Sequence, residues 1–229
     1  MAASSDYARY SDVVEVEIEL DETSAVELTL QPVIRFVGRV STSHGFVPGA
    51  LIRFQAIGAI AYGEAISGPN GAFSFSLPAS TSEVVLVVLP PGLPRRILRI
   101  PVQRGSESGP VEVAIPSIGG ELVVAFSLPE KDFTESGEAP QVRLSQVIIY
   151  DNTPVSLHSL LDPSGIGMSN LDPSTGTIRF TMSPGTYSLC PTAQLTSDCS
   201  RGHLDPGGVL SLTYLVTMEA NGQSTSEGE

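Results

Sequence analysis

The stretches "SGPNGAFSFSLPAS" (67–80) and "SNLDPSTGTIRFTMSPGTYSL" (169–189) decide the fold. Each runs from a polar turn into a glycine, alternates large apolar side chains with small or charged ones, and then reaches a proline. Alternation with a period of two is typical of a strand that turns one face to a hydrophobic core. Because the chain contains this pattern twice, the sequence predicts a repeated β module.

Apolar and polar side chains alternate in short runs along the whole chain, including the two quoted stretches. These runs lie at 14–20, 26–30, 35–40, 50–56, 72–77, 84–89, 97–102, 111–115, 120–128, 142–150, 177–182, 186–189 and 210–216. Strand-length runs between turn residues are typical of an all-β sandwich or barrel. The 22 glycines and 18 prolines interrupt helical periodicity. The nearest helical candidate, "SLHSLLDPSG" (156–165), is stopped by its Asp-Pro pair.

The domain boundaries follow from two similar strand openings. "QPVIRFVGRV" (31–40) and "IPSIGGELVV" (115–124) each pass a proline and begin a strand beside a glycine. The sequence therefore predicts a first sandwich at 33–117 and a second at 118–218, with a disordered polar tail at 219–229. We expect residues 1–32 to form a β-hairpin, either the end of a preceding repeat or a strand pair that stands in for it.

That hairpin has an apolar face, because Val14, Val16, Ile18 and Leu20 alternate with acidic side chains. A two-stranded hairpin is only marginally stable by itself, and an uncovered strand edge favours association. We therefore expect the hairpin to pack on the first sandwich or to form a homodimer with a second molecule.

The two sandwiches resemble carboxypeptidase regulatory-like repeats of exported bacterial proteins. The first carries Gly38 and Val40, then "VPGALIRF" (47–54), and then the alternating "GAFSF" (71–75). The second carries Gly176, Ile178, Phe180 and the later motif "PGTYSL" (184–189). Each half thus holds part of the pattern. The resemblance implies two tandem Ig-like or prealbumin-like antiparallel β-sandwiches preceded by the hairpin.

The motif residues have a direct physical interpretation. A glycine at the end of a polar turn supplies a positive φ, which predicts such a conformation for Gly71 and Gly176. Phe73 and Phe75 share one face of their strand, as do Ile178 and Phe180. We expect these faces to be the hydrophobic core.

Charge and hydropathy restrict the class of partner. The formal net charge is −13, which disfavours a nucleic-acid or anionic-membrane surface. We find no apolar run of membrane-spanning length. The start, "MAASSDYARYSDVVEVEIEL" (1–20), has no basic region followed by an apolar one, so it is not a signal peptide. The chain is then either cytosolic or a segment of a longer exported protein, and we favour the second.

No motif predicts catalysis, a cofactor or a firm metal site. His44, His158 and His203 have no catalytic spacing, and nucleophile-elbow, metalloprotease and phosphate-loop motifs are lacking. Three weaker alternatives remain open. The acidic face of the first hairpin could bind a cation, Asp172 in "NLDPSTG" (170–176) could bind calcium, and Cys190, Cys199 and His203 could bind zinc.

The single lysine disfavours one kind of covalent lock. Lys–Asn isopeptide bonds occur in related surface repeats and need a core lysine. Lys131 lies in the polar stretch "PEKDFTESGE" (129–138) of the second sandwich, and the first sandwich has no lysine. We therefore expect no isopeptide crosslink in the first sandwich and disfavour one in the second.

The two cysteines predict a disulfide. Cys190 ends a strand, Cys199 precedes the last strand, and a polar segment separates them. A Cys190–Cys199 bridge indicates export to the periplasm, the cell surface or the medium. The chain then reads as a non-catalytic structural or interaction module, a spacer or docking unit for neighbouring domains or another surface protein. The alternative is an accessory ligand- or polysaccharide-binding module attached to a secreted enzyme or outer-membrane receptor.

Overall fold

The computed structural model describes residues 9–11, 23, 25, 27, 30–59, 61–102, 110–127, 147–151, 153–161, 171–172, 176–191 and 199–215. These residues form an all-β structure, which confirms the predicted fold class. The one helix among them is the 3-10 helix η1 (Leu157–Leu160), a single turn inside the predicted helical candidate. The described part of the chain contains no helix long and apolar enough to cross a membrane.

The strands among the described residues form four sheets. The first contains β1 (Arg9–Ser11), β2 (Leu30–Thr42), β3 (Gly45–Phe46), β6 (Ala72–Pro78) and β9 (Val111–Ala114). The second has the order β5 (Tyr62–Ile66), β4 (Leu51–Ile57), β7 (Glu83–Leu89), β8 (Arg96–Pro101). The third has the order β13 (Leu171–Asp172), β14 (Thr177–Met182), β10 (Gly120–Ser127), β17 (Val209–Leu215). The fourth has the order β12 (Pro154–Ser156), β11 (Ile148–Tyr150), β15 (Gly185–Cys190), β16 (Ser200–Leu204).

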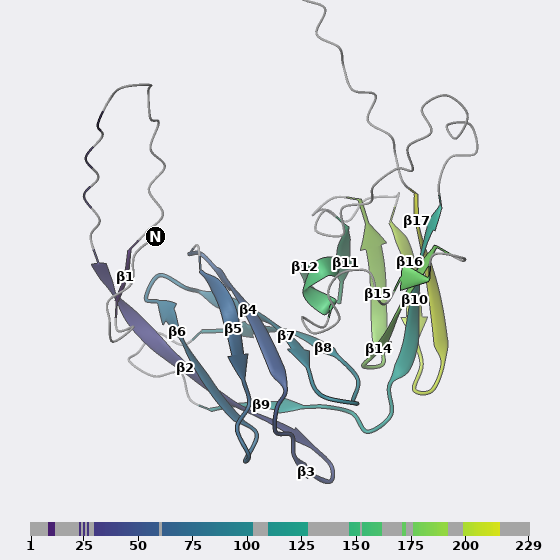
Figure 1. Ribbon diagram of the computed structural model, residues 1–229, viewed down its shortest axis with the longest axis horizontal. Helices are drawn as coiled ribbons and strands as arrows, with labels where there is room; N and C mark the ends of the chain where they lie inside the picture. The colour runs from purple at the N-terminus through teal and green to yellow at the C-terminus, as the bar shows by residue number, and fades with distance from the viewer. Residues whose placement is uncertain are drawn as a thin grey trace, which may run out of the picture.

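The strand pairing follows the same order in the two halves of the chain, β1–β9 and β10–β17. In the first half, β2 pairs with β6 antiparallel and with β9 parallel. In the second half, β10 pairs with β14 antiparallel and with β17 parallel. The quoted stretches therefore contain β6 and β14, which pair antiparallel with β2 and β10 respectively. Figure 1 shows the two groups of strands, with β7 and β8 on the side of the first group that faces the second.

An aromatic cluster joins the first two sheets. Phe36 on β2 stacks on Phe75 of β6 at 4.9 Å between ring centroids, and Phe75 stacks on Phe54 of β4 at 3.9 Å. Phe73 belongs to the same core and is buried. In the second half, Ile178 and Phe180 are buried as well. The faces predicted from the alternation are therefore the core faces.

The two turn glycines adopt the predicted conformation. Gly71 has φ 72° and Gly176 has φ 60°. A side chain on Gly71 would also be impossible sterically, because its Cβ would lie 2.3 Å from the carbonyl oxygen of Val40. Glycine is needed there both for its positive φ and for the close approach of β2.

The "PGTY" motif forms a tyrosine corner. Tyr187, on β15, is fully buried, and its hydroxyl donates a hydrogen bond of 2.6 Å to the carbonyl oxygen of Ser183. A corner of this kind ties a strand to the turn that precedes it. Burial raises the pKa of the Tyr187 phenol well above its ordinary value; the negative charge of Asp151 raises it further, and Arg96 lowers it.

The N-terminal segment is described only in part. Strand β1 pairs antiparallel with the start of β2, with Arg9 opposite Pro32 and Ser11 opposite Leu30. The predicted strand at 14–20, most of 26–30 and the tail 219–229 lie outside the described residues. The homodimer expected through this segment stays a prediction, as do the domain boundaries.

The tyrosine corner makes a testable contribution to stability. We expect Tyr187→Phe to lower the free energy of unfolding by about 1–3 kcal/mol, because it leaves a buried carbonyl without its donor. Urea unfolding measures this change. Tyr214→Phe is the matched control, because Tyr214 is half-buried and packs its ring edge against Phe126. Equal effects of the two substitutions would contradict the assignment.

The same residue predicts a loss of stability at high pH. In the unfolded chain a tyrosine loses its proton near pH ~10, whereas folded Tyr187 keeps its proton at higher pH because its pKa is raised. The stabilisation is therefore complete below about pH 10 and falls as pH rises above it. We expect the unfolding free energy of Tyr187→Phe to fall less steeply than that of the parent protein between about pH 10 and 11.5. Identical slopes would count against a buried neutral phenol.

Candidate functional site

The candidate site is the junction between the two halves, and it is built on β7. The sequence of β7 is EVVLVVL, and all its residues after Glu83 are buried. Val84, Leu86 and Val88 point into the core of the first half. Val85, Val87 and Leu89 point the other way and join the core of the second half. A strand buried on both faces is expected to be a continuous apolar run.

The second half covers β7 with β12 and η1. The hydroxyl of Ser156 caps η1 by accepting a hydrogen bond of 3.2 Å from the backbone N–H of His158. Leu157 and Leu160 are fully buried, and they belong to the cluster that contains Val85 and Val87. The cap therefore fixes a short turn whose two leucines belong to the same apolar cluster as Val85 and Val87 of β7.

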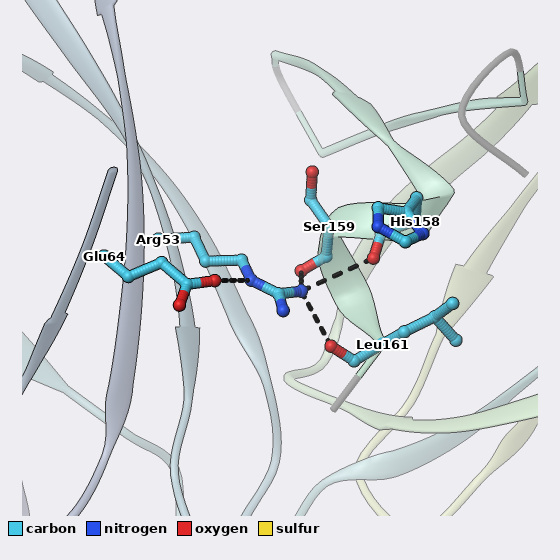
Figure 2. Close-up of polar contacts among 5 residues, drawn as sticks. All are labelled: Arg53, Glu64, His158, Ser159 and Leu161. Atoms are coloured by element: carbon cyan, nitrogen blue, oxygen red, sulfur yellow. Dashed lines mark hydrogen bonds and ion pairs between the residues drawn. The ribbon is translucent and has the colours of Figure 1, made fainter. Parts of the chain in front are cut away.

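Arg53 crosses the junction beside this turn. Its Nη1 donates hydrogen bonds to the carbonyl oxygens of Ser159 (2.8 Å), Leu161 (2.7 Å) and His158 (3.4 Å). Its Nε pairs with Oε1 of Glu64 on β5 at 2.8 Å. Figure 2 shows the guanidinium between Glu64 on one side and the three carbonyls on the other. The His158 carbonyl also accepts a hydrogen bond of 3.1 Å from the N–H of Leu161. Carbonyls at the end of a helical turn generally lack intrahelical donors, and a cation such as Arg53 satisfies them well.

Backbone hydrogen bonds also join the two halves, at Arg95 of the first half and residues 181–183 of the second. The N–H of Arg95 donates to the carbonyl of Thr181 at 2.9 Å, and the N–H of Ser183 donates to the carbonyl of Arg95 at 2.8 Å. The Arg95 guanidinium lies over the Phe180 ring, 5.1 Å from its centroid. The two halves thus share a short β-bridge next to β14.

A glycine permits this close approach. A Cβ on Gly119 would lie 2.5 Å from Cγ of Pro94 and 2.7 Å from the carbonyl oxygen of Met182. Neither contact is compatible with a side chain, so the connection between β9 and β10 can run against the bridge only with glycine at this position. The junction is therefore held by apolar burial, by Arg53 and by a backbone bridge together.

Two charged side chains, one from each half, influence each other electrostatically across the junction. Burial raises the pKa of the Asp151 carboxyl in the second half, and the Arg96 guanidinium on β8 lowers it. Arg96 also donates a hydrogen bond to the carbonyl oxygen of Ala114. The positive charge of Arg96 offsets part of the cost of partly burying the Asp151 carboxylate near Tyr187.

Two grooves flank Arg53 along the junction. One, of about 850 Å³, lies between β4–β5 and β12–η1, with Gln55, Tyr62, Val87, Val155 and Ser159 in its walls. The other, of about 470 Å³, has Leu51, Ile66, Leu89, Arg95 and Arg179 in its walls. Strand β5 contributes to both grooves, with Tyr62 and Glu64 in the first and Ile66 in the second. The face of β5 that bears these side chains therefore lies beside the junction.

The predicted disulfide is present, joining Cys190 and Cys199 with a Cα–Cα distance of 4.4 Å. Both sulfurs are used in this bond, so the alternative zinc site with His203 has lost two of its three ligands. Nδ1 of His203 instead lies 3.1 Å from the hydroxyl oxygen of Thr186, and its Nε2 lies 3.7 Å from Oδ1 of Asp205. His44 and His158 are exposed and far apart in the sequence. Within the described ranges, no three His, Cys, Asp or Glu side chains gather into a group that could hold a metal ion.

Several expectations lie outside the described residues. They concern the side chain of Asp172, residues 173–175 of its turn, and Lys131. Most of the acidic side of the first hairpin also lies outside, apart from the exposed Glu27.

Sequence reasoning missed the residues that build the junction. It recognised the run 84–89 as a strand but not as a strand buried on both faces, although an uninterrupted apolar run is the signal for this. It missed β5, because the side chains that β5 turns to the core are Gly63 and Ala65. A Cβ at Gly63 would lie 2.8 Å from the Phe54 ring, so the strand lacks the large apolar residues by which strands are recognised.

Comparisons with known proteins give remote structural similarity. No protein-family model matches the chain, and no curated protein matches it. The TIE protein of Bacillus anthracis is 12% identical, with a TM-score of 0.31 over 88% of this chain and 37% of that protein. A minor pilin of Streptococcus agalactiae is 14% identical, with a TM-score of 0.27 over 81% of this chain and 97% of the pilin. A streptococcal ancillary pilin is 13% identical, with a TM-score of 0.29 over 86% and 72%.

The chain therefore spans little more than a third of the length of TIE. Since no family model matches, the resemblance to carboxypeptidase regulatory-like repeats stays a prediction.

Arg53 provides a direct test of the junction. We expect Arg53→Met to lower the free energy of unfolding by about 1.5–3 kcal/mol, the range for hydrogen bonds to a charged group, because its side chain is only 17% exposed. Chemical denaturation measures the change. Arg179→Met is the matched control: Arg179 pairs with Glu121 at 2.9 Å but is 56% exposed, so we expect about 1 kcal/mol or less. Similar values for both variants would contradict a special role of Arg53.

The disulfide is testable by mass. We expect the non-reduced protein to lack two hydrogens relative to the reduced chain, and iodoacetamide to modify Cys190 and Cys199 only after reduction. Intact-mass spectrometry under denaturing conditions makes both measurements. Two alkylated cysteines in unreduced protein would show that the bond does not form.

Proposed function

We propose that the chain is a non-catalytic structural and interaction module, a tandem β-sandwich unit of a larger exported bacterial surface protein. Two repeats, at 33–117 and 118–218, make up this unit. The shared pairing order supports the repeat, because β2 and β10 each have an antiparallel neighbour on one side and a parallel neighbour on the other. The disulfide supports an oxidising location such as the periplasm, the cell surface or the medium.

The observation that carries the proposal is the burial of β7 on both faces. Inter-domain interfaces that are small and polar leave domains free to move, whereas a large apolar interface does not. Here Val85, Val87 and Leu89 share one core cluster with the second half. The unit is a rigid spacer, and it holds whatever is attached to its two ends at a fixed distance and orientation.

A distance measurement tests this rigidity. Spin labels on genetically encoded keto amino acids at Ser74 (β6) and Thr213 (β17), both exposed, leave the disulfide intact. We expect pulsed electron–electron double resonance to give one narrow distribution of the distance between the two labels. Val87→Asp places a charge in the junction core and should broaden the distribution, while Val209→Asp at an exposed position should not. A broad distribution in the parent protein would overturn the proposal.

A further inference from the structure

Within the described part of the chain, strand β5 is the open edge of its sheet, and it lies beside the junction. It is the terminal strand of the order β5–β4–β7–β8, and its described pairing is to β4 alone. Sheet edges offer unpaired backbone donors and acceptors, and proteins commonly protect them with proline, lysine or a bulge. The sequence of β5, YGEAI, contains neither residue, and its ladder with β4 is regular from Tyr62 to Ile66.

The hydrogen-bond pattern identifies the backbone groups that face outward. Ala56 donates to the carbonyl of Ala61, and Ser67 donates to the carbonyl of Ala50. Bonded and non-bonded pairs alternate along an antiparallel ladder, so the odd-numbered residues of β5 face β4. The N–H and C=O groups of Tyr62, Glu64 and Ile66 therefore point to the open edge. An added antiparallel strand would exchange hydrogen bonds with these three residues.

The side chains of the same three residues are also available. Tyr62 is 73% exposed and Ile66 is 69% exposed, and both line junction grooves. They lie on the face of the sheet that bears Val85 and Val87, because Arg53 of that face pairs directly with Glu64. The described residues of the second half cover this face over β7 but not over β5. The apolar surface of β5 is thus continuous with the junction.

Glu64 is the one charged residue in the sequence of β5. Arg53 contacts Oε1 of Glu64, and the Glu64 side chain remains 52% exposed. In an antiparallel pair, the residue opposite Glu64 projects its side chain on the same face, where a basic residue is favoured and an acidic one is not. The net charge of −13 attracts a cationic segment over longer range.

We propose that β5 binds an extended segment of a partner protein by antiparallel strand addition. The segment has two apolar residues four positions apart, which meet Tyr62 and Ile66, and a basic residue midway, which meets Glu64. Main-chain hydrogen bonds supply affinity in this mode, and alternate side chains supply specificity. The inference rests on the proposed interaction module and names the surface that the module uses.

A designed peptide tests the pairing. The probe is a fluorescein-labelled, amidated heptapeptide with isoleucine at positions two and six, arginine at position four and threonine elsewhere. We expect saturable binding to the full chain by fluorescence anisotropy. N-methylation at positions two, four and six should weaken binding at least about tenfold, because those amides pair with β5. N-methylation at positions three and five is the matched control, since those amides point away.

Protein variants locate the site. Tyr62→Lys and Ile66→Lys should each weaken binding about tenfold or more, because they replace the apolar contact with a charge. Val209→Lys is the control, at a position that is 65% exposed on β17. Glu64→Gln, combined with glutamine in place of the peptide arginine, should give a coupling of about two- to fivefold in a double-mutant cycle. Melting curves verify that each variant is folded.

Three results would overturn the inference: no saturable binding, equal loss from both methylation patterns, or equal loss from Val209→Lys. A fourth is a dimer of the parent protein, seen by sedimentation and abolished by Tyr62→Lys, because a second copy would then occupy β5. The distance measurement on the peptide-free protein tests the rigid module independently of peptide binding. A narrow distribution without peptide binding refutes only the role of β5, whereas a broad one refutes the rigid module.

Discussion

The burial of β7 on both faces is the constraint on which the rest of the structure depends. One set of alternate side chains completes the core of the first half, and the other set completes the core of the second. At roughly 1.5–3 kcal/mol for each large apolar side chain buried, three residues on the outer face contribute a large share of the stability of a single domain. Separating the halves would expose this face to water, so the junction and the second core are stabilised by one shared apolar cluster.

The polar contacts of the junction make this packing specific. Two apolar surfaces can slide past each other without losing much contact. The hydrogen bonds of Arg53 and the backbone bonds at Arg95 form only when their donors and acceptors are aligned. Gly119 adds a steric condition, since it lets the chain pass Pro94 at a distance that no other residue permits. Burial thus supplies most of the energy, while directional contacts and a missing Cβ determine how the halves meet.

The sequence predicts much of this fold and little of its junction. Alternation and turn glycines identify strands such as β6 and β14, because these features depend on local backbone geometry. Arg53 reveals nothing by itself, since its acceptors are backbone carbonyls more than a hundred residues away, and any residue type could supply them. Strand β5 escapes recognition for a steric reason: the Phe54 ring occupies the space that a large side chain at Gly63 would need.

The later motif, "PGTYSL" (184–189), occurs in the second half alone, and this corresponds to a difference between two strands. Strand β7 of the first half occupies the place that β15 occupies in the second, next to β4 and β11 respectively. Inward positions are alike, with Val84, Leu86 and Val88 in one and Tyr187 and Leu189 in the other. The alternate positions differ: β7 carries Val85 and Val87 under the second half, whereas β15 carries the buried Ser188 and the buried, disulfide-bonded Cys190. Both strands thus keep large apolar side chains on the face of their own core and differ on the opposite face. The inward faces of β7 and β15 therefore show how the two halves are alike, and the opposite faces show how they differ.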